Sequence, residues 1–174
     1  MSGELRKDEK EIGSKVDPKS VDALFEFYKD TFDMEERRKD TLENKASMVL
    51  GFSGIIAGLI TGLLAGSLSS NPIILIIFFS SVLSFTISGL FALLTVKLKN
   101  YMAPFNALTP ELIDDLVSKD PVVLRNEIVK NYSDALINNQ TLNNQKAKHL
   151  VIAFYSATIG IAMTLITSIL AALI

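Results

Sequence analysis

The sequence contains no cysteine, no tryptophan and a single histidine among its 174 residues. A chain without cysteine forms no disulfide, has no thiolate metal site and offers no thiol nucleophile. The sequence has no basic excess, because it contains 17 Lys and Arg and 19 Asp and Glu. Nucleic-acid binders normally carry surplus positive charge. No Gly-rich phosphate loop, HExxH, EF-hand spacing or nucleophile beside a base occurs. We therefore expect a protein that is not an enzyme and that holds no cofactor or metal.

Charge is absent from two long stretches, residues 46–96 and 149–174, which together make up 77 positions. About 20 apolar residues in a helix match a hydrocarbon layer of about 30 Å. The sequence therefore predicts an all-α integral membrane protein with three transmembrane helices, at 46–66, 72–96 and 149–174.

The polar break at 67–71 contains no Lys or Arg and is closed by Pro72, which predicts a tight hairpin between the first two spans. Basic residues accumulate in cytoplasmic flanks, so the N-terminus and residues 97–148 are expected in the cytoplasm, with the C-terminus outside the inner (plasma) membrane. The charged start of the chain predicts no cleavable signal peptide. The expected interface anchors are Lys45, Lys97, Lys146, Lys148 and His149.

The cytoplasmic regions are expected at 17–45 and 97–148, after a mobile N-terminal tail at 1–16. Asp17-Pro18 predicts the start of one helix that continues into the first span, and Asp120-Pro121 predicts another that continues into the third. A short helix from Thr109 to near Lys119 and a non-helical joint at 100–109 are expected between them. The two long helices should pair and form a cytoplasmic stalk. Their apolar positions are Val21, Leu24, Phe25, Tyr28 and Phe32 in the first, and Leu124, Ile128, Tyr132, Ala135, Leu136, Leu142 and Leu150 in the second.

Residues 41–46, which precede the first span, are echoed by residues 141–147 before the third. The echo has two interpretations, a shared structural role or coincidence, since any helix that enters a bilayer favours a Lys at that place.

Small residues recur at every fourth position in each span, and they are the main candidates for helix packing or oligomerisation. The stripes are Gly54, Gly58, Gly62 and Gly66 in the first span, Ser80, Ser84, Ser88 and Ala92 in the second, and Ser156, Gly160, Thr164, Ser168 and Ala172 in the third. Small residues let helix backbones approach closely in lipid. The stripes could pack the three helices of one subunit together, or at least one could face a neighbouring copy, in a homo-oligomer.

Further hydroxyls in the spans have two interpretations as well: they could line a weakly selective pore, or bond to carbonyls one turn earlier and across helices. They are Ser81, Thr86, Thr95, Thr158 and Thr167.

Four further features carry weaker signals. His149 is either a pH sensor or an amphipathic anchor. Arg37 and Arg38 belong either to a solvated helix face or to a phosphate contact, and Asp114-Asp115 lacks the partners of a metal site. The amide-rich run at 138–145 either fixes helix register or forms a hydrated face.

Three segments resemble the Pycsar transmembrane effectors and the related SLATT domains of prokaryotic anti-phage signalling. They are Glu36-Arg37-Arg38 followed by 42–46, the two-span hairpin, and 126–128 through 144–147. The resemblance covers about three quarters of the chain. It implies an oligomeric effector that breaches the inner membrane when a cytoplasmic cyclic nucleotide signals infection, although no separate nucleotide-binding domain is evident.

The leading hypothesis is therefore an oligomeric membrane effector or channel-like protein, with Arg37, Arg38 and Arg125 as candidate anion or ligand contacts. The alternative is a non-conducting accessory or scaffolding protein that binds a cytoplasmic partner. A transporter subunit ranks last, because no charge lies within a span.

Overall fold

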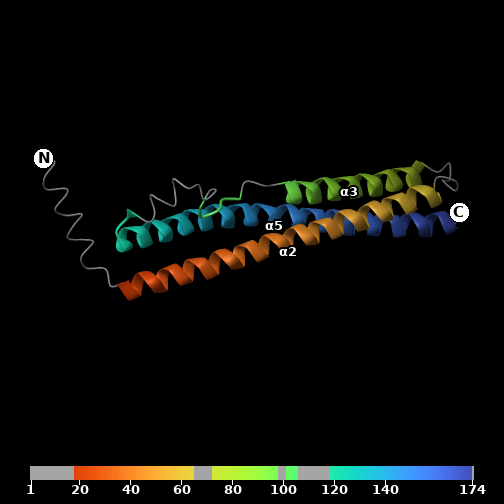
Figure 1. Cartoon of the computed structure of the whole chain (residues 1–174). Coiled ribbons are helices and arrows are strands. Elements are labelled where there is room, and N and C mark those ends of the chain that lie inside the picture. Colours follow the sequence, from red (N-terminus) through yellow and green to blue (C-terminus); the bar gives the residue numbers. More distant parts are fainter. Residues whose placement is uncertain (1–17, 65–71, 98–100, 106–117, 174) are drawn as a thin grey trace, which may run out of the picture. The chain divides into compact units, whose positions relative to one another are not determined.

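The regular structure of the described residues is helical throughout. The computed structural model describes residues 18–64, 72–97, 101–105 and 118–173. They form three long helices, α2 (Pro18–Leu64), α3 (Pro72–Lys97) and α5 (Pro121–Leu173), shown in Figure 1. All three are long and apolar enough to cross a membrane, so the predicted all-α membrane architecture is confirmed. The expected N-terminal tail, the 67–71 turn, Gly66 and the short helix from Thr109 lie outside the described residues.

Proline begins each helix, as the sequence predicts. Pro at the first helical position costs no hydrogen bond and presets the backbone angle. At α5 the Asp120 carboxylate also caps the helix, because Oδ1 accepts a 2.9 Å hydrogen bond from the Val122 amide. α2 and α5 then run for 47 and 53 residues, so the two expected long helices are present. Residues 101–105 are non-helical, which confirms the described part of the expected joint.

The chain divides into two compact units. Unit 1 comprises Met1–Arg37 and Tyr101–Thr141, and unit 2 comprises Arg38–Asn100 and Leu142–Ile174. α2 and α5 contribute to both units, whereas α3 belongs to unit 2 alone.

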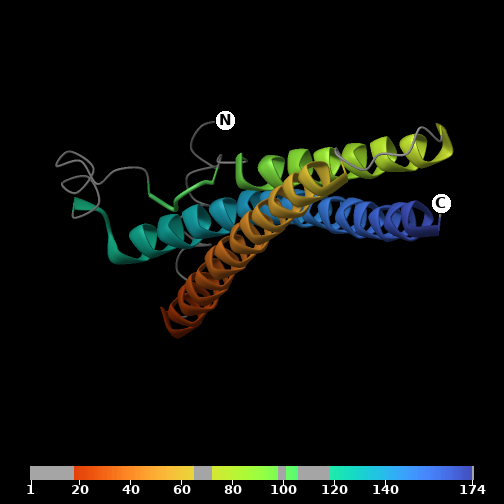
Figure 2. The same ribbon diagram turned by 90° about the vertical axis from the view of Figure 1, so that its right-hand side faces the viewer.

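In unit 2 three helical segments lie side by side (Figures 1 and 2). Ser88 of α3 bonds to the Ala153 carbonyl of α5, while the earlier Ser81 bonds to the later Gly160 carbonyl. α3 therefore runs antiparallel to α5. Since the α2 residue Glu43 pairs with Lys146 near the start of the α5 segment, α2 and α5 run parallel, which suits three successive membrane crossings.

The inward-facing positions of unit 2 alternate between steps of three and four residues. This is the 3.5-residue period of left-handed bundles whose helices cross at about 20°. The buried or half-buried series are Lys39, Leu42, Ala46, Val49, Ser53, Ile56 and Ile60 on α2, Ile74, Phe78, Ser81, Phe85, Ser88, Ala92 and Thr95 on α3, and Asn143, Lys146, Leu150, Ala153, Ala157, Gly160, Thr164 and Thr167 on α5. A strict four-residue row instead turns by about 40° per step, so it leaves the inner face within a few turns.

Unit 1 packs α2 against α5 around an aromatic cluster. The Tyr132 ring meets the rings of Phe25 and Phe32 edge to face at 5.7 Å and that of Phe105 at 6.4 Å. Pairing of the two long helices is thus confirmed here. The interpretation of Leu24 as part of the apolar packing face was wrong, because 48 % of its surface remains exposed.

Candidate functional site

The glycines of α2 lie on an open face of unit 2. A methyl group added at Gly51, Gly54, Gly58 or Gly62 would meet no described atom within 4 Å. Ser47 and Thr61 are also exposed and continue the same face. We call Ser47, Gly51, Gly54, Gly58 and Thr61 the small face of α2; their spacing alternates between four and three residues, as the inner series does.

The interpretation that Gly54, Gly58 and Gly62 pack the helices of one subunit together was therefore wrong. The period of 3.5 residues places Ser53, Ile56 and Ile60 inward. Gly54 follows Ser53 by one position, and Gly58 and Gly62 follow Ile56 and Ile60 by two, so these glycines are rotated away from the inner residues by about 100° and about 160°.

A shallow groove between α2 and α3 borders this face. It has a volume of about 210 Å³. Its lining combines the small Ser53, Gly54, Ala57, Thr86 and Gly89 with the bulkier Leu50, Val82 and Phe85. Small residues of both helices therefore contribute to this depression.

Only some of the small residues of the other two spans make contacts between helices of the same subunit. A methyl group at Gly160 would come within 3.0 Å of the Phe85 ring, and Thr164 Oγ1 lies 2.7 Å from Ser81 Oγ. Ser88 is fully buried between α2 and α5, where it bonds to Ala153 and contacts Ser53 Oγ at 3.2 Å. Ser84 and Ser168 follow the four-residue spacing, and each donates a hydrogen bond to a carbonyl of its own helix. Ser84 is half-buried and Ser168 is exposed.

The hydroxyls considered above as a pore lining donate hydrogen bonds within the subunit. Thr86, Thr95, Thr158 and Thr167 donate to carbonyls four residues earlier, and Ser81 donates across to α5. This confirms the interpretation that these hydroxyls bond back or across helices.

Lys146 has a different environment from the one expected of an interface anchor. Its side chain is 0 % exposed and its ammonium group pairs with the Glu43 carboxylate of α2. It occupies an inner position of the 3.5-residue series, so its charge is directed into the bundle and does not reach outward. The echoed Lys45 is exposed, which shows that the two similar segments do not place their lysines equivalently.

The amide residues that precede Lys146 in the sequence also make specific contacts. Asn143 is also 0 % exposed, and Arg38 donates a 2.9 Å hydrogen bond to Asn144 Oδ1. In unit 1, Asn139 exchanges two hydrogen bonds of 2.9 and 3.0 Å with the Met102 backbone. These contacts favour the interpretation that the amide run fixes register.

The remaining expected anchors are less enclosed. Lys45, Lys97 and Lys148 are exposed. The His149 ring lies 5.8 Å from that of Phe91, and its buried Nδ1 has no hydrogen-bond partner among the described residues.

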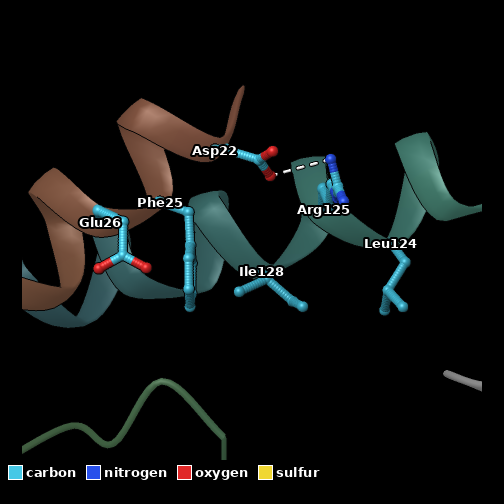
Figure 3. A pocket seen from close by; sticks show the side chains of 6 residues that line it. All are labelled: Asp22, Phe25, Glu26, Leu124, Arg125 and Ile128. Atoms are coloured by element: carbon cyan, nitrogen blue, oxygen red, sulfur yellow. Dashed lines mark ion pairs between the residues drawn. The ribbon is translucent and has the colours of Figure 1, made fainter. Parts of the chain in front are cut away.

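Unit 1 contains an open groove of about 420 Å³ between α2 and α5 (Figure 3). Phe25, Leu124 and Ile128 point to one side and form its apolar lining. At the rim, Arg125 Nη1 lies 2.9 Å from Asp22 Oδ1, so this candidate anion contact already binds a carboxylate. Glu26 adds a second acidic group, which gives the rim more negative than positive charge.

The three candidate arginines belong to two units: Arg37 and Arg125 to unit 1, and Arg38 to unit 2. Within the described ranges no group of three His, Cys, Asp or Glu side chains is placed to bind a metal.

The described residues therefore define the class of protein. It is an all-helical protein whose three helices are each long and apolar enough to cross a membrane. No family model, curated protein or solved structure matches the chain.

Proposed function

We propose that the chain is a homo-oligomeric membrane effector whose copies associate through the small face of α2. The observation that carries this proposal is the open space around Gly51, Gly54, Gly58 and Gly62. Each glycine in a helix interior costs about 1 kcal/mol relative to alanine, and no described contact within the subunit offsets that cost.

Association of copies would offset the cost in helix propensity of these glycines. In lipid, helices are held together by close packing, which small residues permit. The alternating spacing of the small face suits a neighbouring helix that crosses at about 20°. The groove beside Gly54 offers space for one of its side chains.

The proposed surroundings and trigger of the effector are supported by the sequence. The distribution of Lys and Arg supports a cytoplasmic location of unit 1, and we propose the inner membrane as the site of the spans. The resemblance to anti-phage effectors makes membrane disruption during infection the outcome and a cyclic nucleotide the first ligand to test. Arg37, Arg38 and Arg125 are its candidate contacts, although Arg38 and Arg125 already bond to Asn144 and Asp22.

Any conducting path would lie between subunits, because the span hydroxyls are satisfied inside each one. The same observation favours a second candidate function, a non-conducting scaffold that assembles through the same face and binds a cytoplasmic partner.

Membrane potential in cells that express the protein separates these functions. We expect a potentiometric dye to report depolarisation on addition or induced synthesis of cyclic pyrimidine nucleotides. Gly58→Leu should abolish it, since a side chain at this position fits the subunit but obstructs a neighbour. Ile55→Leu, on the exposed face beside it, is the matched control. Unchanged polarisation in every case would reject the effector, and a stoichiometric partner that co-purifies would favour the scaffold.

A further inference from the structure

Unit 1 carries an exposed apolar stripe on α2 that its own packing does not use. Leu24, Phe27 and Met34 are 48, 62 and 61 % exposed. Thr31 lies between them, and its hydroxyl is satisfied by the Phe27 carbonyl at 2.7 Å. The four residues are spaced by three, four and three positions, so they share one side of the helix over about three turns. We call them the apolar stripe.

The packing of unit 1 uses a different side of the same helix. Val21 and Phe32 are buried, and Phe25 and Phe32 meet the Tyr132 ring of α5. Within the described part of unit 1, the apolar stripe is therefore left exposed.

Lipid does not account for the exposure of the apolar stripe. The described part of unit 1 carries nine acidic and six basic side chains, a density of charge that a hydrocarbon layer does not admit. Contiguous apolar side chains on a surface in water mark sites of interaction, and anchors at this spacing are typical of a helix that packs against a second helix.

The charge around the stripe selects the occupant. Glu26, Asp30 and Asp33 lie on the adjacent face of α2. Residues 18–37 contain six acidic and three basic side chains. An anionic membrane surface is repelled by such a face. A second copy, held parallel by the membrane, would bring Asp30 and Asp33 against their own equivalents, which like-charge repulsion disfavours.

We propose that the apolar stripe of unit 1 binds a basic amphipathic helix of a cytoplasmic partner protein. Apolar residues of that helix would cover Leu24, Phe27 and Met34, and its Lys or Arg side chains would meet Glu26, Asp30 and Asp33. This deepens the proposed function, on which it rests in one respect, the cytoplasmic location of unit 1. It adds a partner protein to the candidate nucleotide ligand.

A model peptide tests the surface with the full-length protein in a neutral detergent. The probe is a fluorescein-labelled synthetic helix of Leu and Lys, with Leu on one face. Its control is a peptide of the same composition and charge in which the Leu residues do not share a face. Fluorescence anisotropy should show at least tenfold tighter binding of the amphipathic peptide, and Asp30→Asn with Asp33→Asn should weaken that binding and reduce its dependence on salt.

Variants of the protein locate the site. Phe27→Gln with Met34→Gln should weaken binding at least tenfold, because two anchors are lost. Ile137→Gln on α5 is the matched control, since Ile137 is 61 % exposed in the same unit, and it should bind the probe as the unchanged protein does.

Several results would overturn this inference. They are equal binding of both peptides, equal loss in the Ile137→Gln variant, no binding at all, tighter association with anionic vesicles than with the peptide, and a fall in subunit number in the Phe27→Gln, Met34→Gln variant, which would assign the stripe to a second copy. Binding to a protein that proves monomeric would refute oligomeric assembly and leave the partner site intact, so the two failures are distinguishable.

Discussion

Units 1 and 2 differ in the side chains through which their helices pack. In unit 1 the contact between α2 and α5 is aromatic, with Phe25 and Phe32 on either side of Tyr132. In unit 2 small and hydroxyl side chains such as Ser81, Ser88 and Gly160 share the inner face with large apolar ones such as Phe78 and Phe85. Burial of large apolar area drives association in water, whereas in lipid that drive is absent and close backbone approach replaces it.

The exposed surfaces of the two units also differ, with large apolar side chains common on unit 2. In unit 2 large apolar side chains such as Phe52, Leu59 and Phe79 are more than half exposed, which is what contact with lipid requires. The exceptional exposed surface of unit 2 is therefore its small face, and that of unit 1 is its apolar stripe. Each surface is unusual for the solvent that its unit is expected to meet.

The largest expected effect comes from the buried ion pair of unit 2. Glu43→Ala leaves the fully buried ammonium group of Lys146 without this carboxylate. Loss of one partner of a buried pair costs about 3–5 kcal/mol, and we expect about 3 kcal/mol here because the Glu43 side chain is 31 % exposed. Replacing both residues, by Glu43→Leu with Lys146→Met, should restore most of that loss. Reversible unfolding in mixed detergent micelles would measure both.

Asp40→Ala is the control for the ion pair, since Asp40 is 67 % exposed and its pair with Lys39 is 3.7 Å long; surface pairs contribute about 0–1 kcal/mol. An effect of Glu43→Ala no larger than that of Asp40→Ala would contradict the structural role of the pair.

The second effect tests the aromatic half of the comparison. Tyr132→Ala removes the ring that three other rings contact, and we expect unit 1 to lose about 2–3 kcal/mol, below the range for a fully buried ring because Tyr132 is half-buried. Amide hydrogen exchange should accelerate in residues 121–141 and not in 72–97. Tyr155→Ala, at a position 70 % exposed in unit 2, should leave both rates unchanged, and equal acceleration in both regions would refute the independence of the units.

The smallest effect compares two glycines. Gly160→Ala places a methyl group 3.0 Å from the Phe85 ring and should destabilise the subunit by about 1–2 kcal/mol through overpacking. Gly58→Ala meets open space and should gain up to about 1 kcal/mol of helix propensity. Thermal unfolding of detergent-solubilised monomers would rank the variants, and the reverse order would show that Gly58 is the inner residue.

Helix number and helix starts could be predicted from the sequence, because they depend on local features. Proline at positions 18, 72 and 121 marks each start, and the uncharged stretches mark the spans. The inner face could not be taken from small residues alone. Gly54 and Gly160 look alike in a four-residue stripe, yet only Gly160 contacts another helix.

The inner face of each span follows an alternating spacing of three and four residues, as Ile74, Phe78, Ser81 and Phe85 do. Exposed large residues such as Ile76, Phe79 and Leu83 have the same spacing, so spacing alone does not distinguish the inner face from the outer one. The burial of Lys146 and its pairing with Glu43, 103 positions away in the chain, could not be predicted either, since both depend on how α2 and α5 align.

The subunit count tests the central claim, association through the small face of α2, most directly. Native mass measurement in mild detergent should give an oligomer for the unchanged protein and for Ile55→Leu, and a monomer for Gly58→Leu with its helix content retained. A monomeric unchanged protein, or a Gly58→Leu variant that keeps the full oligomer, would contradict it.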